Sequence, residues 1–325
     1  MKSTLFKGAP PVLYHAISSY QLLEVMLHRI FFHKKEKAVL ILPDFIVGKY
    51  PQYPALVTSR FFDEVYLFPY LQIPHRDETH ILADVARCYR QTIPYDIASF
   101  AQIYVAGAHF YFSLYLIQKK IPFVFFEDAA GMLSRPDTLY GTLRKTYPVH
   151  AELAQKYGMF DGSSPLVCRI LCLKRAQTRD VSAKKYEDFC VEEALEALSR
   201  AKRRRIVRFF LKRQLQTNAQ AVLLTQHFAN LGVMDTETQR QLYADLRDGA
   251  LRGVRLAVKP HPDDTLDYGQ IFPGVYVIRE IFPAELLPYV FRKKPQVLYT
   301  FDSTGCENLR EHFVIQKIER EKNAK

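Results

Sequence analysis

The sequence has no tryptophan, only five cysteines among 325 residues, and no long hydrophobic run. The cysteine count is odd and the spacing forms no framework, so we predict no disulfides and a reducing compartment. Cys168 and Cys172 are the only close pair, and no second Cys/His pair completes a zinc site, so we predict no metal centre. Residues 121–126 are too short an apolar stretch to cross a bilayer, and residues 1–11 lack the apolar run of a signal peptide.

Three common nucleotide and hydrolase motifs are also absent. Without Gly-x-Gly-x-x-Gly after a predicted strand, a dinucleotide cofactor is not expected. Without Gly-x-x-x-x-Gly-Lys-Ser/Thr, the chain is excluded from the P-loop NTPases at the level of the motif. Without Gly-x-Ser-x-Gly, the usual hydrolase nucleophile turn is missing as well.

Positive charge is in surplus. The 45 lysines and arginines outnumber the 34 acidic residues, which leaves a formal charge of +11. Such a surplus favours an anionic partner. Composition alone does not choose among nucleic acid, an anionic membrane surface, and phosphorylated or carboxylated substrates. The length suits about two domains, and 48% hydrophobic residues suit folded cores.

Short apolar runs alternate with segments of helical periodicity along the chain. The predicted strands are residues 38–42, 64–68, 102–106, 122–126, 219–224, 254–258, 274–278 and 296–300. The predicted helices are residues 20–33, 80–89, 109–119, 187–216 (as one or two helices), 236–247 and 283–291, whereas residues 140–185 follow no regular pattern. We therefore predict two Rossmann-like α/β domains, residues 1–180 and 181–325, whose mostly parallel sheets face each other across a cleft.

Two adjacent acids, Glu127 and Asp128, follow the last predicted strand of the first half, and Gly131 follows shortly after. Mutual repulsion raises a carboxylate's pKa toward the range of a general base. A glycine lets the backbone turn sharply and approach a substrate. The alternative is that one acid caps the next helix while the other is solvated.

A second polar group, Lys259 to Pro262, follows the predicted strand at 254–258. The prolines on either side of His261 restrict its backbone. A histidine held there, with a lysine nearby, can bind a phosphate or protonate a leaving group. The alternative is a histidine in a rigid turn without chemistry.

Hydroxyl and amide groups follow two further strands of the second half. Ser303 and Thr304 precede a predicted helix start, where hydroxyls and backbone amides form anion sites. The alternative is an ordinary helix cap. The two interpretations are compatible, because a capping hydroxyl and free amides can both bind a phosphate. Thr225 and Gln226 follow the strand at 219–224 and suit a nucleobase or ribose contact. Together these strand ends predict a nucleotide phosphate site.

A strongly basic segment lies in the predicted helix at 187–216, with apolar residues interspersed. Its basic residues are Lys202, Arg203, Arg204, Arg205, Arg208, Lys212 and Arg213. One interpretation is a solvated basic face over a packed apolar one, and another is an amphipathic helix that docks on anionic lipid. Nucleic acid is not an expected partner because no nucleic-acid-binding motif accompanies the segment.

The order of these motifs resembles the bacterial sialyltransferases of GT-B fold, which share an acidic D/E-D/E-G motif, an H-P motif and a downstream S-S/T motif. The corresponding residues here are Glu127-Asp128, His261-Pro262 and Ser303-Thr304, although two alanines separate the acids from Gly131. The second half also resembles glycosyltransferase family 52 and the bacterial polysialyltransferases, in residues 223–226, 237–246, 259–262, 267–268 and 283–287.

This resemblance implies an inverting, metal-independent transfer of sialic acid from CMP-sialic acid to a glycan hydroxyl of lipooligosaccharide or capsule, with no cofactor. Glu127 or Asp128 would be the base, and His261 with Ser303 and Thr304 would stabilise the departing phosphate. The implied location is the bacterial cytoplasm, with peripheral attachment to the inner face of the membrane. The alternatives are a CDP- or UDP-linked donor, or a non-enzymatic, membrane-associated nucleotide-binding protein.

Overall fold

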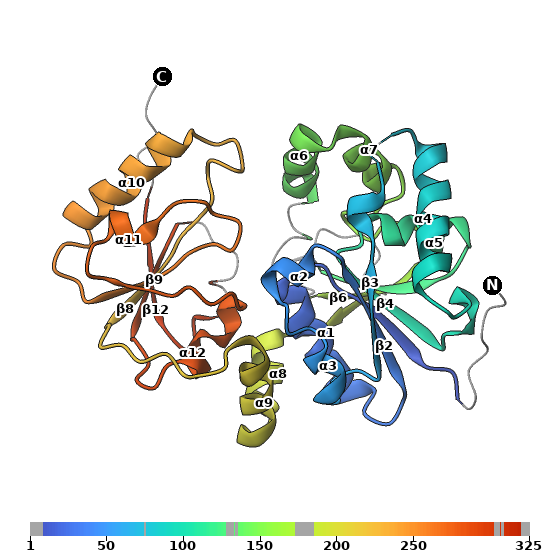
Figure 1. The fold of residues 1–325 in the computed structure, drawn as a ribbon, viewed down its shortest axis with the longest axis horizontal. Coiled ribbons are helices and arrows are strands. Elements are labelled where there is room, and N and C mark those ends of the chain that lie inside the picture. Colours follow the sequence, from blue (N-terminus) through green and yellow to red (C-terminus); the bar gives the residue numbers. More distant parts are fainter. Residues whose placement is uncertain are drawn as a thin grey trace. The chain divides into compact units, whose positions relative to one another are not determined.

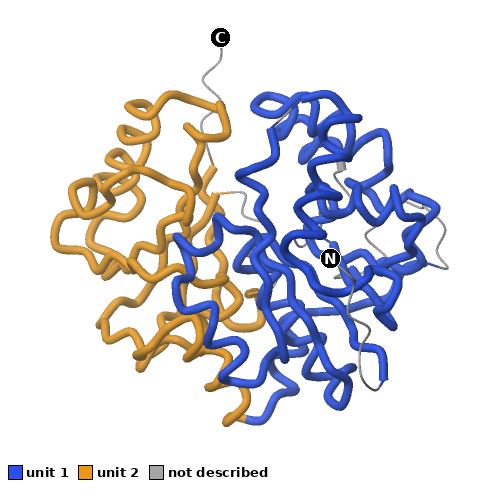
Figure 2. Tube along the Cα trace, turned by 45° about the vertical axis from the view of Figure 1, so that its right-hand side comes forward, with its two compact units in different colours: residues 1–199 blue, residues 200–325 orange. Residues whose placement is uncertain are grey.

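The computed structural model describes residues 9–74, 76–127, 133, 136–172, 185–301, 306 and 309–319. The chain divides into two compact units, Met1–Ser199 and Arg200–Lys325 (Figure 2). Each unit is built on its own parallel sheet, with helices packed against it (Figure 1). Both therefore have the Rossmann-like α/β architecture that alternating strands and helices predict.

The first unit contains a seven-stranded sheet in the order β3-β2-β1-β4-β5-β6-β7. Its strands are β1 (Val12–His15), β2 (Ala38–Pro43), β3 (Glu64–Phe68), β4 (Gln102–Ala106), β5 (Phe123–Phe126), β6 (Val167–Cys172) and β7 (Tyr186–Asp188). Its α-helices are α1 (Ser19–Phe32), α2 (Ile46–Lys49), α3 (Ala55–Thr58), α4 (Glu78–Thr92), α5 (Tyr111–Gln118), α6 (Pro136–Thr146), α7 (Pro148–Lys156) and α8 (Val191–Ala197). Every strand pair is parallel, and the chain reverses its direction across the sheet between β1 and β4.

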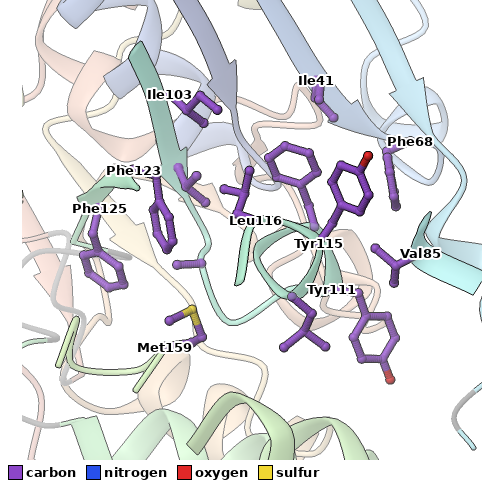
Figure 3. Close-up of a cluster of buried hydrophobic side chains, with 14 of the residues drawn as sticks. Ile41, Phe68, Val85, Ile103, Tyr111, Tyr115, Leu116, Phe123, Phe125 and Met159 are labelled. Carbon is purple, nitrogen blue, oxygen red and sulfur yellow. The ribbon is translucent and has the colours of Figure 1, made fainter. Parts of the chain in front are cut away.

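The larger core cluster of this unit lies on one face of the sheet. Side chains of β2 to β5 meet those of α4 and α5 there, as Figure 3 shows for Phe68, Val85 and Tyr115 among others. Tyr115 stacks on Tyr89 of α4 with ring centroids 4.3 Å apart. Such pairs contribute energy beyond the apolar area they bury, so they fix α4 and α5 on the sheet.

The central strand β1 was not predicted from the sequence. It is only four residues long, and its sequence Val-Leu-Tyr-His lacks a long apolar run. It becomes a strand because β2 and β4 pair with it on both sides, and all four residues are buried. Parallel strands of this kind are stabilised by non-local pairing, which a short local pattern does not indicate.

The second unit contains a five-stranded parallel sheet in the order β10-β9-β8-β11-β12. Its strands are β8 (Ala221–Leu224), β9 (Leu256–Lys259), β10 (Tyr276–Val277), β11 (Val297–Thr300) and β12 (Val314–Lys317). Its α-helices are α9 (Arg200–Phe210), α10 (Thr236–Asp248), α11 (Tyr268–Ile271) and α12 (Leu287–Val290). Tyr243 of α10 and Tyr268 of α11 pack against Leu223 and Val258 of the sheet.

Two regions differ from the prediction. Residues 187–216, expected as one or two long helices, begin in strand β7 and continue as the short helices α8 and α9. Residues 140–185, expected to be irregular, contain most of α6 as well as α7 and β6. Because β7 pairs in register with β6, it belongs to the first sheet, and the boundary between the units falls after Ser199 instead of near residue 180.

Among the residues that the structure describes, no helix has the length and hydrophobicity to span a membrane.

Candidate functional site

Three strand ends lie side by side in the second unit. In the register of the sheet, Leu224 of β8 is paired with Lys259 of β9 on one side and with Thr300 of β11 on the other. The chain reverses its direction across the sheet between β8 and β11. Open parallel sheets bind ligands beyond the carboxyl ends of their strands at such a reversal, so the loops that begin here form the candidate site.

The structure brings Thr225 and His261 together at this edge. The side chain of Thr225 is buried, and its Oγ1 accepts a hydrogen bond from the backbone N–H of His261 at 3.0 Å. The amide of Thr225 in turn donates to the carbonyl of Lys259 at 3.2 Å. Thr225 therefore holds the loop after β9 in place, and the nucleobase or ribose contact predicted for it stays a prediction.

The ring of His261 is held by the residues around it. Its Nδ1 accepts a hydrogen bond from the backbone N–H of Asp263 at 3.2 Å. An imidazole that accepts at Nδ1 carries its hydrogen on Nε2 when it is neutral. The side chain of His261 is 30% exposed, and an Nε2–H group is a donor of the kind that phosphate oxygens accept from.

A second imidazole, that of His227 in the loop after β8, stacks on His261. The ring centroids are 3.7 Å apart and the planes are inclined by 18°. Ligand atoms of His227, His261 and Asp263 lie within 4.8 Å of one another, which makes the group a candidate for metal binding. In two nearly parallel stacked rings, the nitrogen lone pairs point along parallel planes and do not converge. Zinc needs two nitrogen lone pairs that point at the same metal position, with Zn–N distances of about 2.0–2.1 Å. One ring would have to rotate for both imidazoles to bind the same metal ion.

One buried side chain, Gln239 of α10, connects the loops after β8 and β9. Its Nε2 donates to the carbonyl of Gln226 at 3.2 Å and to Oδ2 of Asp264 at 2.9 Å. Its Oε1 accepts from the amide of Ala229 at 2.7 Å. Because Gln239 is fully buried, these bonds are shielded from competition with water, and they fix both loops relative to α10.

Two tyrosines complete the support beneath the loops. The hydroxyl of Tyr243 accepts from the amide of Gln226 at 2.7 Å and donates to its carbonyl at 3.1 Å. The hydroxyl of Tyr268 donates to Oδ2 of Asp264 at 2.6 Å. Burial raises the pKa of Tyr243 to about 12, so this hydroxyl keeps its proton at neutral pH and remains both donor and acceptor.

Lys259, the last residue of β9, is buried instead of exposed to solvent. Its Nζ lies 4.3 Å from the centroid of the Phe282 ring. Burial lowers the pKa of Lys259 to about 8, and the attraction of Glu285 opposes that shift. The side chain is therefore mainly charged at pH 7, and the buried Glu285 favours that charged state.

Lys259 should make the stability of the protein depend on pH. The unfolded chain titrates this lysine near 10.5 and the folded protein near 8, so between these values the unfolded state binds more protons. The free energy of unfolding should rise with pH across this window, and below pH 8 the full cost of burying the charge, about 3 kcal/mol, is present. Lys259→Met should therefore lose about 3 kcal/mol of stability relative to the wild type between pH 8 and pH 10.5, as measured by urea unfolding.

The exposed Lys293→Met is the matched control, and it should differ little from the wild type at any pH. A Lys259→Met difference that stayed constant from pH 7 to pH 10.5 would contradict the buried charge.

In the first unit, Glu127 follows β5 directly and is buried with 4% exposure. Its backbone N–H donates to the carbonyl of Leu171 at 2.8 Å, and its Oε1 accepts from the amide of Leu133 at 3.0 Å. The side chain of Glu127 thus contacts the backbone of Leu133, which is a structural contact. Neither Asp128 nor Gly131 is among the described residues.

The reversal point of the first sheet is filled by protein groups. His15, at the end of β1, donates from Nδ1 to the carbonyl of Ala106 at 2.8 Å, and its Nε2 lies 2.8 Å from the hydroxyl of Tyr70. Burial lowers the pKa of His15 to about 4, so it is neutral and Tyr70 donates to it. A Cβ on Gly107, whose φ is +71°, would lie 2.5 Å from the side chain of Ile17. This edge is therefore packed by side chains.

The predicted site residues are thus only partly located. Thr225, Gln226, Lys259, His261 and Pro262 come together at the carboxyl edge of the second sheet. Ser303 and Thr304 lie outside the described residues, although β11, which precedes them, ends beside β8.

The sequence interpretation missed three residues that shape the site: His227, Gln239 and Asp264. His227 had a usable signal because it directly follows Thr225 and Gln226 at a strand end. Gln239 and Asp264 had none, because their contacts join a helix to a loop 25 residues away in sequence.

The basic segment forms helix α9 and the residues after it. The apolar residues Ile206, Val207, Phe209 and Phe210 are buried, so the helix offers no apolar face to a bilayer. Arg203 lies over the ring of Tyr289, 4.6 Å from its centroid. The exposed members of the basic segment are Lys202, Arg204, Arg205, Arg208, Lys212 and Arg213. This pattern of buried apolar and exposed basic residues matches the first interpretation of the segment, a solvated basic face over a packed apolar one.

Comparison with known families gives a match to the model of glycosyltransferase family 52 over residues 86–318. A curated relative from Haemophilus influenzae, described as an uncharacterized protein, is 25% identical over 194 residues. That match covers 58% of this chain and 60% of the relative, so the chain spans less than two thirds of the relative's length.

Solved structures with similar folds include the UDP-GlcNAc 2-epimerase of Methanocaldococcus jannaschii, with a TM-score of 0.56, 12% identity, and coverage of 92% of this chain and 80% of that one. Arabidopsis thaliana UGT89C1, complexed with UDP-L-rhamnose, has a TM-score of 0.55, 11% identity, and coverage of 96% and 79%. At such low identity these similarities concern the fold alone. They support the GT-B class, with two Rossmann-like domains.

Proposed function

Because the chain belongs to glycosyltransferase family 52, we propose that it transfers sialic acid from CMP-sialic acid to a hydroxyl of a cell-surface glycan, lipooligosaccharide or capsule. The observation that carries the proposal is the placement of His261. The residue lies at the carboxyl edge of the second sheet, beside the β8–β11 reversal, with its backbone bound to Thr225. Nucleotides bind at this position in doubly wound sheets.

In the proposed reaction the acceptor hydroxyl attacks the anomeric carbon, and the bond from that carbon to the phosphate oxygen breaks. The electron pair of that bond leaves with CMP, and the configuration inverts. His261 stabilises the charge on the departing phosphate through Nε2–H, and the charged Lys259 behind the loop adds positive potential. Ser303 and Thr304 are proposed to bind the same phosphate, and no metal or cofactor takes part.

We propose Asp128 as the base that takes the proton of the acceptor hydroxyl. The sequence alone leaves Glu127 and Asp128 equivalent. Glu127 is buried and its Oε1 accepts a hydrogen bond from the amide of Leu133, so its carboxylate already has a structural contact. That observation favours its neighbour for the chemical role.

The donor is tested by thermal unfolding of the protein with CMP, CDP and UDP. A nucleotide present at 100 times its dissociation constant should stabilise the folded state by about 2.7 kcal/mol. We expect CMP to raise the melting temperature most. Stabilisation by UDP or CDP without CMP would contradict the sialic acid donor and favour another nucleotide-linked sugar in the same site.

We also propose that the protein works in the bacterial cytoplasm, attached electrostatically to the inner face of the membrane. The exposed basic residues of the α9 segment support this, since each exposed lysine or arginine near an anionic surface adds about 1 kcal/mol of attraction. The apolar side of α9 is buried, so attachment does not involve insertion of this helix.

Charge reversal tests this attachment. The four-fold variant Lys202→Glu, Arg204→Glu, Arg205→Glu, Arg208→Glu should lose binding to phosphatidylglycerol-containing vesicles in a flotation assay but keep transfer to a soluble acceptor. The control variant reverses four exposed lysines outside the segment: Lys34, Lys35, Lys119 and Lys120. Equal loss in both variants would show a general charge effect, whereas vesicle binding by a wild-type protein that shows no donor turnover would favour a non-enzymatic membrane-binding role.

A further inference from the structure

We infer that His227 is a positioning residue, which holds the imidazole of His261 in the orientation that the donor phosphate requires. The inference rests on the proposed function and adds to it a residue outside the family motifs quoted above. It comes from the nearly parallel stack of the two rings, whose centroids are 3.7 Å apart. His227 acts through His261 and is not itself assigned a contact with the substrate.

Two contacts of His261 hold its backbone and one ring nitrogen. Thr225 fixes the backbone of His261, and the amide of Asp263 is bonded to Nδ1. Neither contact covers the flat face of the ring, and the side chain is 30% exposed. The ring of His227 lies against that face and limits rotation of His261 about its last side-chain bond.

His227 can do this because its own loop is held from below. Gln239 and Tyr243 of α10 bind the backbone of Gln226 on one side of His227, and Gln239 binds that of Ala229 on the other. The stack is therefore formed between two loops that are both fixed before the ligand arrives. Preorganised donors of this kind stabilise a developing charge without reorganisation at the moment of reaction.

Two variants separate the ring of His227 from its polar atoms. His227→Phe keeps a flat ring without ring nitrogens, and His227→Gln keeps a polar group without a ring. We expect His227→Phe to retain kcat within about threefold and His227→Gln to lose about tenfold, because an aromatic pair contributes roughly 2- to 12-fold to an equilibrium. The measurement is release of CMP from CMP-sialic acid in the presence of purified lipooligosaccharide, with the KM for the donor determined separately. Equal losses in the two variants would overturn the stacking role.

A double-mutant cycle then tests whether His227 acts through His261. In a His261→Ala background there is no ring to position, so His227→Gln should cause almost no further loss. A further tenfold loss in that background would overturn the inference, since it would indicate an independent effect. His227→Leu, also without a ring, serves the same cycle if His227→Gln unfolds at the assay temperature.

The cycle also distinguishes failure of the inference from failure of the proposed function. If His261→Ala alone left CMP release unchanged, the proposed function would fail and the inference with it. If His261→Ala reduced CMP release but His227→Gln did not, only the inference would fail. The exposed His80→Gln on α4 is the matched control and should leave every rate unchanged.

Discussion

His261→Ala should keep its fold and lose transfer about 100- to 1000-fold. The expected loss corresponds to about 3–4 kcal/mol in the barrier, the range found when a preorganised donor to a developing anion is removed. The fold should persist because the bond between Thr225 and residue 261 uses only the backbone N–H of that residue, which alanine retains. The loss should lie mainly in kcat, since charge on the phosphate develops as the bond to the sugar breaks.

The measurement is CMP release and glycan transfer at saturating donor, together with thermal unfolding of each variant. His80→Ala, which removes an exposed histidine in the first unit, is the control for loss of an imidazole in general. A fully active His261→Ala protein with an unchanged melting temperature would rule out the assigned role for this residue.

Substitution of the two acids should give unequal results. Asp128→Asn should reduce transfer by 100-fold or more, because a positioned general base typically contributes 10²- to 10⁴-fold and an amide cannot take the proton. Glu127→Gln should remain within about tenfold of the wild type, because the amide oxygen of glutamine can still accept from the amide of Leu133. A pH–rate profile should lose its acidic limb in Asp128→Asn alone.

Glu127→Ala provides the structural counterpart. It removes the acceptor for the buried amide of Leu133, so it should lower the free energy of unfolding by about 1–3 kcal/mol, measured by urea unfolding. If Glu127→Gln abolished transfer while Asp128→Asn did not, Glu127 would be the base, and its carboxylate would have a chemical role in addition to its contact with Leu133.

Much of the architecture was predictable because parallel sheets buried on both faces contain continuous apolar strands. Strands β2, β3, β4, β5, β8, β9, β10 and β11 lie within or close to the predicted ranges, and all of them belong to the two sheets. Strands β1, β6, β7 and β12 were not predicted, and β1 and β7 belong to the first sheet through their pairing with neighbouring strands. The unit boundary moved to Ser199 for the same reason, since β7 pairs with β6.

The sequence alone identified His261, Lys259 and Thr225, because in a parallel α/β unit polar residues directly after buried strands must emerge at one edge of the sheet. It also indicated the family through motif order. Only the tertiary structure decided what these residues contact. It showed that Thr225 binds the backbone of His261, that Lys259 is buried, and that His227 stacks on His261. Those contacts join loops that follow different strands, and their geometry depends on strand register and on the packing of α10, which no local pattern encodes.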